Sequence, residues 1–120
     1  MFMTLTTREI VLTATLTLGF GLFVSLSAGQ DADQIKKGES VYTAQKCQMC
    51  HAIAGKGNKA NPLDGVGGKL NADGIREWIT HPSDMMAKTK STKKPPMPDK
   101  YGSLPAEDLD ALVAYMASLK

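Results

Sequence analysis

Cys47, Cys50 and His51 are the residues whose types and spacing are best suited to chemistry. They belong to the run Cys-Gln-Met-Cys-His, and the chain of 120 residues has no other cysteine. Two thiols at this spacing can add to the two vinyl groups of one haem, and the imidazole that follows can bind the iron from the same side. The pattern therefore predicts one covalently bound haem c, attached at Cys47 and Cys50, with His51 as an iron ligand.

Three other uses of these residues fit the sequence less well. A redox-active Cys-x-x-Cys pair is typical of a βαβ unit, and no such unit is visible. A zinc site would need a fourth ligand such as His81, and adjacent Cys and His side chains rarely reach one metal. A disulfide suits an oxidising compartment but leaves His51 without a role.

The second face of the iron would be empty or would take a methionine or a histidine. Beyond residue 30 the methionines are Met49, Met85, Met86, Met97 and Met116. Met49 lies between the cysteines and cannot reach the opposite face, whereas Met116 fits the apolar stripe of a helix. Met85 and Met86 remain alternatives, on a segment that we expect to be a loop without rigid support.

Met97 is the predicted second ligand. It is flanked by Pro95, Pro96 and Pro98, and prolines lower the entropy lost when a loop is ordered. His81, at a predicted helix end, is the weaker rival. Ligation by His and Met fills both axial positions and favours ferrous iron, which argues for electron transfer and against catalysis at the haem.

The chain divides into an N-terminal segment, 1–29, and one domain, 30–120. Residues 10–28 carry no charge. They predict an apolar helix that is either a cleaved export signal or an uncleaved membrane anchor, which needs roughly 20 apolar residues. Both interpretations place the domain outside the cytoplasm, in the periplasm or at the periplasmic face of the inner membrane.

The domain is expected to be all-α. Helical spacing predicts a first helix over about 33–46, a middle helix that Asn71 caps and Pro82 ends, and a last helix with Pro105 in its first turn. No stretch alternates apolar and polar residues as a half-buried strand would. The apolar stripe of the last helix is Leu109, Leu112, Val113, Met116 and Leu119.

Two segments of the domain are predicted to be loops, and the domain is poor in aromatic residues. Segment 55–69 is rich in Gly, Asn and Lys, and segment 83–101 should be extended, with a short turn near Met85. The aromatic residues of the domain are Tyr42, Trp78, Tyr101 and Tyr115. Because aromatic rings usually supply much of a core, we expect the haem to fill part of the interior.

The stretch from Lys37 to Lys120 resembles the class I cytochrome c family. The pieces that carry this resemblance are Gly38-x-x-x-Tyr42, Cys47-x-x-Cys50-His51, Asn61-Pro62-Leu63, Met97 in its proline-rich loop, and Leu112-Val113-Ala114-Tyr115. The resemblance implies four or five helices around one haem, with the first and last helices crossing at Gly38. It also implies that the Pro62 carbonyl accepts the Nδ1 proton of His51. Pro62 follows Asn61 here, whereas the family often has Gly at that position.

Trp78 and Tyr101 each allow two interpretations. As large side chains they suit core packing. Alternatively, the indole N–H and the phenol hydroxyl can donate to a haem propionate, since buried Trp and Tyr usually find a hydrogen-bond partner. Neither residue is expected to be catalytic, and the sequence offers no other catalytic group.

The charge of the chain indicates a protein partner rather than a nucleic acid. The net charge is only +2, which gives no basis for nucleic-acid binding. Five lysines surround the predicted Met97 loop and either attract an acidic redox partner or merely keep the loop solvated. These lysines are Lys88, Lys90, Lys93, Lys94 and Lys100.

Three interpretations of function follow from these features. The first is an electron carrier of a respiratory or photosynthetic chain, which is not an enzyme. The second is a membrane-anchored cytochrome subunit of a larger oxidoreductase complex, which retention of segment 10–28 would favour. The third is an enzyme or gas sensor in which Met97 leaves the iron, and carbon monoxide binding to the reduced protein would support it.

Overall fold

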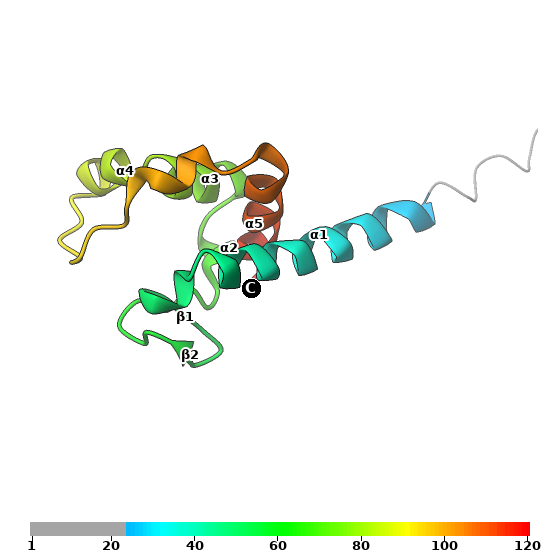
Figure 1. The fold of residues 1–120 in the computed structure, drawn as a ribbon, viewed down its shortest axis with the longest axis horizontal. Helices are drawn as coiled ribbons and strands as arrows, with labels where there is room; N and C mark the ends of the chain where they lie inside the picture. Colours follow the sequence, from blue (N-terminus) through cyan, green and yellow to red (C-terminus); the bar gives the residue numbers. More distant parts are fainter. Residues whose placement is uncertain (1–23) are drawn as a thin grey trace, which may run out of the picture.

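Five α-helices make up most of the part of the chain that the computed structural model describes, residues 24–120 (Figure 1). Side chains are described from Asp31 onward. The elements in chain order are α1 (Val24–Ala44), η1 (Cys47–Met49), β1 (Ala52–Ile53), β2 (Lys56–Gly57), α2 (Val66–Lys69), α3 (Ala72–Thr80), α4 (Pro82–Thr89), η2 (Asp99–Ser103) and α5 (Ala106–Ser118), where η marks a 3-10 helix.

The first and last helices cross at Gly38, as the resemblance implied. A Cβ atom at Gly38 would overlap the carbonyl oxygen of Ala111 and lie 2.6 Å from Cβ of Tyr115. The absence of a side chain therefore lets the backbones of α1 and α5 approach closely. Tyr42, one turn further along α1, packs edge-on against Tyr115 with ring centroids 5.9 Å apart.

We predict that Gly38→Ala lowers the free energy of unfolding by about 3 kcal/mol or more, because the added methyl group meets backbone atoms that cannot move aside. The matched control is Gly68→Ala in α2, where a Cβ meets nothing within 4 Å. That change should be neutral or stabilising by about 0.4–1 kcal/mol. Thermal unfolding of both haem-loaded variants measures the difference, and equal stability would contradict the crossing geometry.

The middle of the domain contains more helices than the sequence predicted. Asn71 caps α3 as expected, its side chain accepting from the Gly74 N–H at 2.8 Å. The expectation of a loop over 83–101 is wrong at both ends, because α4 and η2 occupy it. Pro82 ends α3 but is also the first residue of α4, where a proline is favoured because its missing N–H has no partner to lose.

A small hairpin corrects the all-α expectation. Ala52 pairs with Gly57 and Ile53 with Lys56 in a two-stranded antiparallel sheet. The two residues of its turn have positive φ, 52° at Ala54 and 75° at Gly55, which is the conformation that tight hairpins favour. Strands of two residues are too short for alternation to be recognised in a sequence. The predicted loop 55–69 also contains the short helix α2.

Most of the predicted N-terminal segment lies outside the described residues, which begin at Val24. Helix α1 runs without interruption from there through residues 29 and 30 and starts well before the predicted position at Asp33. Within residues 24–120, no helix has the length and apolarity that crossing a membrane requires. The two interpretations of residues 10–28, a cleaved export signal or a membrane anchor, both stay predictions.

Candidate haem-binding site

The two cysteines and His51 lie on a single tight turn directly after α1. Lys46, with φ of 57°, turns the chain out of α1 and into η1. The carbonyl oxygen of Cys47 then accepts from the N–H groups of Cys50 at 3.1 Å and His51 at 3.0 Å. Cys47 is half-buried and Cys50 is exposed. Burial also raises the pKa of the Cys47 thiol.

Residues 57–61 hold this turn from outside through its carbonyl groups. The N–H of Asn58 lies 3.1 Å from the Gln48 carbonyl oxygen and 3.0 Å from that of His51. The side-chain amide of Asn61 donates to the Cys50 carbonyl at 3.3 Å. Gly57, with φ of 105°, fits beneath the turn, where a Cβ would overlap the His51 carbonyl oxygen. Sequence reasoning missed these contacts, for which Gly57 and the two asparagines are the only local signal.

His51 is oriented by Asn61 and not by Pro62. The Nδ1 atom of His51 lies 3.2 Å from the Asn61 carbonyl oxygen, so the expectation that Pro62 supplies the acceptor is wrong. Asn61 also accepts from the Ala52 N–H at 3.2 Å, and Leu63 donates to the Ala52 carbonyl at 2.8 Å. Because an extended chain presents successive groups to opposite sides, Asn61 faces the turn and Pro62 does not.

Burial lowers the pKa of His51, and the hydrogen bond to the Asn61 carbonyl opposes this shift only in part. The ring is therefore neutral at neutral pH. With Nδ1–H donating to a carbonyl, Nε2 is the nitrogen that is left with a lone pair for a metal. This is the protonation state that an axial iron ligand needs.

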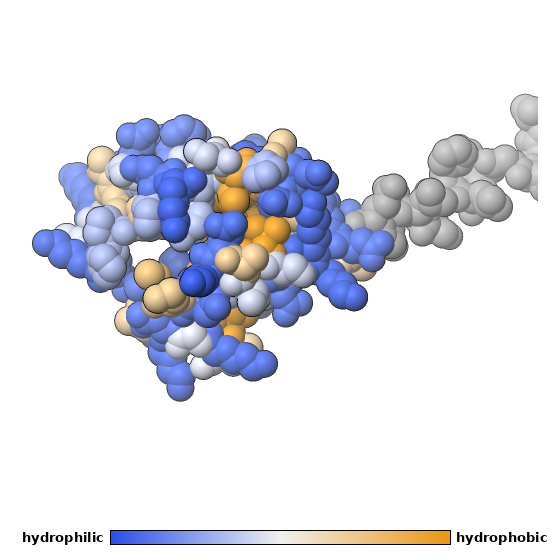
Figure 2. Space-filling model, in the orientation of Figure 1, coloured by the Kyte–Doolittle hydropathy of each residue, from blue (hydrophilic) through white to orange (hydrophobic). Residues whose placement is uncertain are grey.

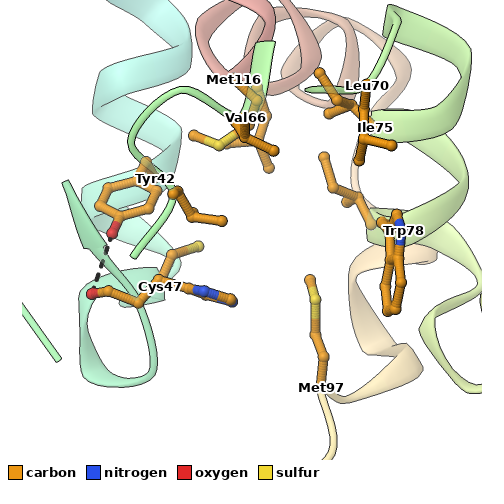
Figure 3. A pocket seen from close by; sticks show the side chains of 12 residues that line it. Tyr42, Cys47, Val66, Leu70, Ile75, Trp78, Met97 and Met116 are labelled. Carbon is orange, nitrogen blue, oxygen red and sulfur yellow. Dashed lines mark hydrogen bonds between the residues drawn. The ribbon is translucent and has the colours of Figure 1, made fainter. Parts of the chain in front are cut away.

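A largely apolar cavity of about 240 Å³ opens beside this turn, and Figure 3 shows its lining side chains. Cys47 projects from one side, and Met97 reaches in from the segment before η2. The molecule is visibly hollowed next to a band of apolar residues in Figure 2. The lining residues are Tyr42, Cys47, His51, Leu63, Val66, Leu70, Ile75, Trp78, Ile79, Met97, Leu112 and Met116.

A second cavity of about 180 Å³ continues the first and shares Cys47, His51, Trp78 and Met97 with it. Its other lining residues come mainly from the turn of residues 46–51 and from the proline-rich segment 91–98. They are Lys46, Cys50, Asn61, Met86, Ser91, Lys93, Pro95, Pro96, Pro98 and Tyr101. The sequence-predicted site residues therefore meet in one place, with the exception of Pro62. Pro62 is exposed and lines neither cavity.

The rival ligands take up different positions. Met97 is half-buried and lines both cavities, whereas Met86 lines only the second. Met116 is 5% exposed within the core, as predicted. His81 is exposed and lines neither cavity. Its Nδ1 atom lies 2.8 Å from the Thr80 hydroxyl oxygen.

Trp78 and Tyr101 both face the cavities with their polar groups unused. Among the described residues, neither the Trp78 indole N–H nor the Tyr101 hydroxyl has a hydrogen-bond partner in the protein. The Lys100 ammonium lies 5.1 Å from the centre of the Tyr101 ring. Sequence reasoning missed Leu63, Val66 and Leu70 as lining residues, although their spacing of three and four is that of one helix face.

The residues present fit a haem. The cavity walls are apolar, and the thiols of Cys47 and Cys50 are free. An imidazole and a thioether line the same space, which is a set of donors that suits haem iron. Within residues 24–120, no cluster of three or more His, Cys, Asp or Glu side chains is arranged so that it could hold a metal ion.

Comparison with known proteins agrees with this geometry. Residues 35–120 match the family described as cytochrome c, and the chain belongs to this family. Membership implies electron transfer through a covalently bound haem c. Cytochrome c oxidase subunit 2 of Alkalihalophilus pseudofirmus is similar, with 30% identity over 93 residues that cover 70% of this chain. The chain spans only about a quarter of that relative's length. No solved structure matches the chain.

Proposed function

We propose that this chain is a class I monohaem cytochrome c that carries single electrons between redox proteins outside the cytoplasm. The observation that carries the proposal is the apolar cavity with Cys47 and His51 at one wall and Met97 reaching in from another element. A haem held there supplies one-electron exchange between ferric and ferrous iron. The reaction needs no further protein group to transfer protons or bonds, which is consistent with a carrier rather than an enzyme.

Each site residue has a distinct task in this proposal. Cys47 and Cys50 would form the thioether links to the haem, and His51 and Met97 would supply the ligands of its iron. The apolar walls exclude water, which disfavours the more highly charged ferric state and raises the potential. Trp78 and Tyr101 line the cavities and are the proposed hydrogen-bond donors to the haem propionates.

The mass of the natively exported protein tests the proposal directly. One covalent haem should add its mass to the polypeptide, and the same spectrum shows whether segment 10–28 has been removed. The oxidised protein should also show the weak methionine-to-iron charge-transfer band near the red edge of the visible spectrum. A colourless polypeptide with unmodified thiols at Cys47 and Cys50 would exclude the proposed function.

A subunit role is the second candidate, and the similarity to a cytochrome c oxidase subunit favours it. In that case the domain would deliver electrons within a complex, held at the periplasmic face of the inner membrane by segment 10–28. Retention of this segment, together with co-purification of a haem-containing oxidoreductase from detergent extracts, would support the subunit role. A freely soluble mature protein that lacks the segment would favour the diffusible carrier.

The lysines near the Met97 loop are the proposed docking surface for an acidic partner. Lys93 lines the second cavity, and Lys88 lies 3.5 Å from Glu77. Among the described residues, Lys90, Lys93 and Lys94 form no salt bridge. Their charge is therefore free to steer a negatively charged reactant toward the cavity mouth.

Charge reversal tests this surface. Lys93→Glu combined with Lys94→Glu should slow electron exchange with hexacyanoferrate, an anion, several-fold at low ionic strength and flatten the salt dependence of the rate. Stopped-flow kinetics at several salt concentrations measure both effects. Lys36→Glu, on α1 and outside both cavity linings, is the single-charge control and should change the rate less. A wild-type rate that does not depend on salt would exclude steering by these lysines.

A further inference from the structure

The segment that carries Met97 has little backbone support of its own. It follows α4 and precedes η2, and no helix or strand covers residues 91–98. Within the described part of the chain, residues 92–97 take part in no backbone–backbone hydrogen bond. Its prolines limit φ but do not fix where the segment lies relative to the cavity. Contacts beyond the segment must therefore hold Met97 in place.

Both ends of this segment are tied to α4. At the N-terminal end, Lys90 has a φ of 53° and Ser91 donates its N–H to the Met86 carbonyl at 2.9 Å. At the C-terminal end, the carboxylate of Asp99 accepts twice from Ser83. The Ser83 N–H reaches Oδ1 at 3.2 Å, and the Ser83 hydroxyl reaches Oδ2 at 2.7 Å.

Helix α4 is itself a fixed support. Pro82, the residue before Ser83, is less than 2% exposed. The chain passes from α3 to α4 through His81 alone, whose N–H donates to the Glu77 carbonyl at 2.8 Å and whose carbonyl accepts from Met85 at 3.0 Å. Since α3 carries Trp78 on the cavity wall, Asp99 connects the Met97 segment to the same unit that forms that wall.

We propose that Asp99 is a positioning residue for Met97, acting through its paired hydrogen bonds to Ser83. The inference rests on the proposed function, in which Met97 binds the iron. A neutral thioether is a weak ligand, so its occupancy of the iron depends on how closely the loop confines the sulfur. Without the Asp99–Ser83 hydrogen bonds, the fraction of molecules in which Met97 has left the iron rises. A competing ligand then gains apparent affinity in the same proportion.

Imidazole binding to the full-length, haem-loaded ferric protein tests this role, with loss of the methionine-to-iron band as the signal. Asp99→Ala and Ser83→Ala should each raise the affinity for imidazole about fivefold to tenfold, the range expected for losing one or two modest hydrogen bonds. The double variant should match the single ones within about twofold, because both changes break the same tie. Asp99→Asn should stay near wild type, since its amide can accept from the Ser83 N–H and donate to the hydroxyl.

Asn71→Ala is the matched control, because it removes the cap of α3 and leaves residues 91–99 untouched. It should lower the melting temperature while leaving imidazole affinity near the wild-type value. An equal gain in affinity for Asn71→Ala, or none for Asp99→Ala and Ser83→Ala, would overturn the inference while the proposed function stands. A wild-type protein without the methionine-to-iron band would overturn the Met97 assignment, and this inference with it.

Discussion

Replacing both cysteines with alanine is expected to abolish cooperative folding of the domain. Without attachment the cavity of about 240 Å³ would have to stay empty or collapse. At roughly 24 cal/mol per Å³ an empty cavity of this size costs about 6 kcal/mol. That is comparable to the entire stability of a typical small domain, about 5–15 kcal/mol. Haem-free Cys47→Ala, Cys50→Ala protein should therefore show weakened helical circular dichroism and no cooperative melting transition.

Two further variants separate loss of the haem from a change in the turn. Met49 is 69% exposed between the cysteines, so Met49→Ala should keep the haem and melt close to wild type. Cys50→Ala leaves one thioether link and should give an intermediate stability. A sharp heat-unfolding transition in the haem-free double variant would show that the haem is not a required part of the core.

Met97→Ala is expected to open the iron to added ligands. The methionine-to-iron band should disappear, and the reduced protein should bind carbon monoxide at neutral pH, which the wild type should not do. Affinity of the ferric protein for imidazole should rise by about a hundredfold, equivalent to roughly 3 kcal/mol. The potential should fall, because the soft thioether that favours ferrous iron is gone. Optical titration and a redox titration measure these effects.

Met85→Ala and Met86→Ala are the controls for this assignment. Met97 lines both cavities, whereas Met86 lines only the second and Met85 lines neither. Because Met97 is the proposed ligand, both control variants should retain the charge-transfer band and should not bind carbon monoxide. If the band survives in Met97→Ala and vanishes in Met86→Ala, the sulfur ligand has been assigned to the wrong residue. Carbon monoxide binding by the wild type would instead favour the enzyme or sensor interpretation.

Local signals in the sequence account for the parts of this molecule that were predicted correctly. The cysteine spacing, the Asn71 cap and the apolar stripe of α5 each depend on residues within a few positions of one another. The helix crossing at Gly38 is a long-range contact that the resemblance to the cytochrome c family implied, and the glycine makes it possible because it lets another backbone approach closely. All of these features lie within residues 35–120, the part of the chain that matches the cytochrome c family.

The errors have a common physical origin in tertiary context. Helix α4 has four polar residues among its eight, which leaves little apolar pattern to recognise, and its first residue, Pro82, is buried in the folded domain. The choice between the Asn61 and Pro62 carbonyls depends on the bridge that pairs Ala52 with Pro62. No pattern within either segment reports such a pairing, since it is set by how distant parts of the chain meet.

The hydrogen bonds that hold the turn of residues 47–51 affect the speed of electron exchange. The carbonyls of Gln48, Cys50 and His51 all receive hydrogen bonds from residues 58–61, and the imidazole is bonded as well. A ligand restrained at its backbone and at its ring can shift little when the charge at the metal changes. In the proposed cytochrome, the nuclear rearrangement that accompanies each oxidation or reduction would then be small, so little thermal activation would be needed before an electron moves.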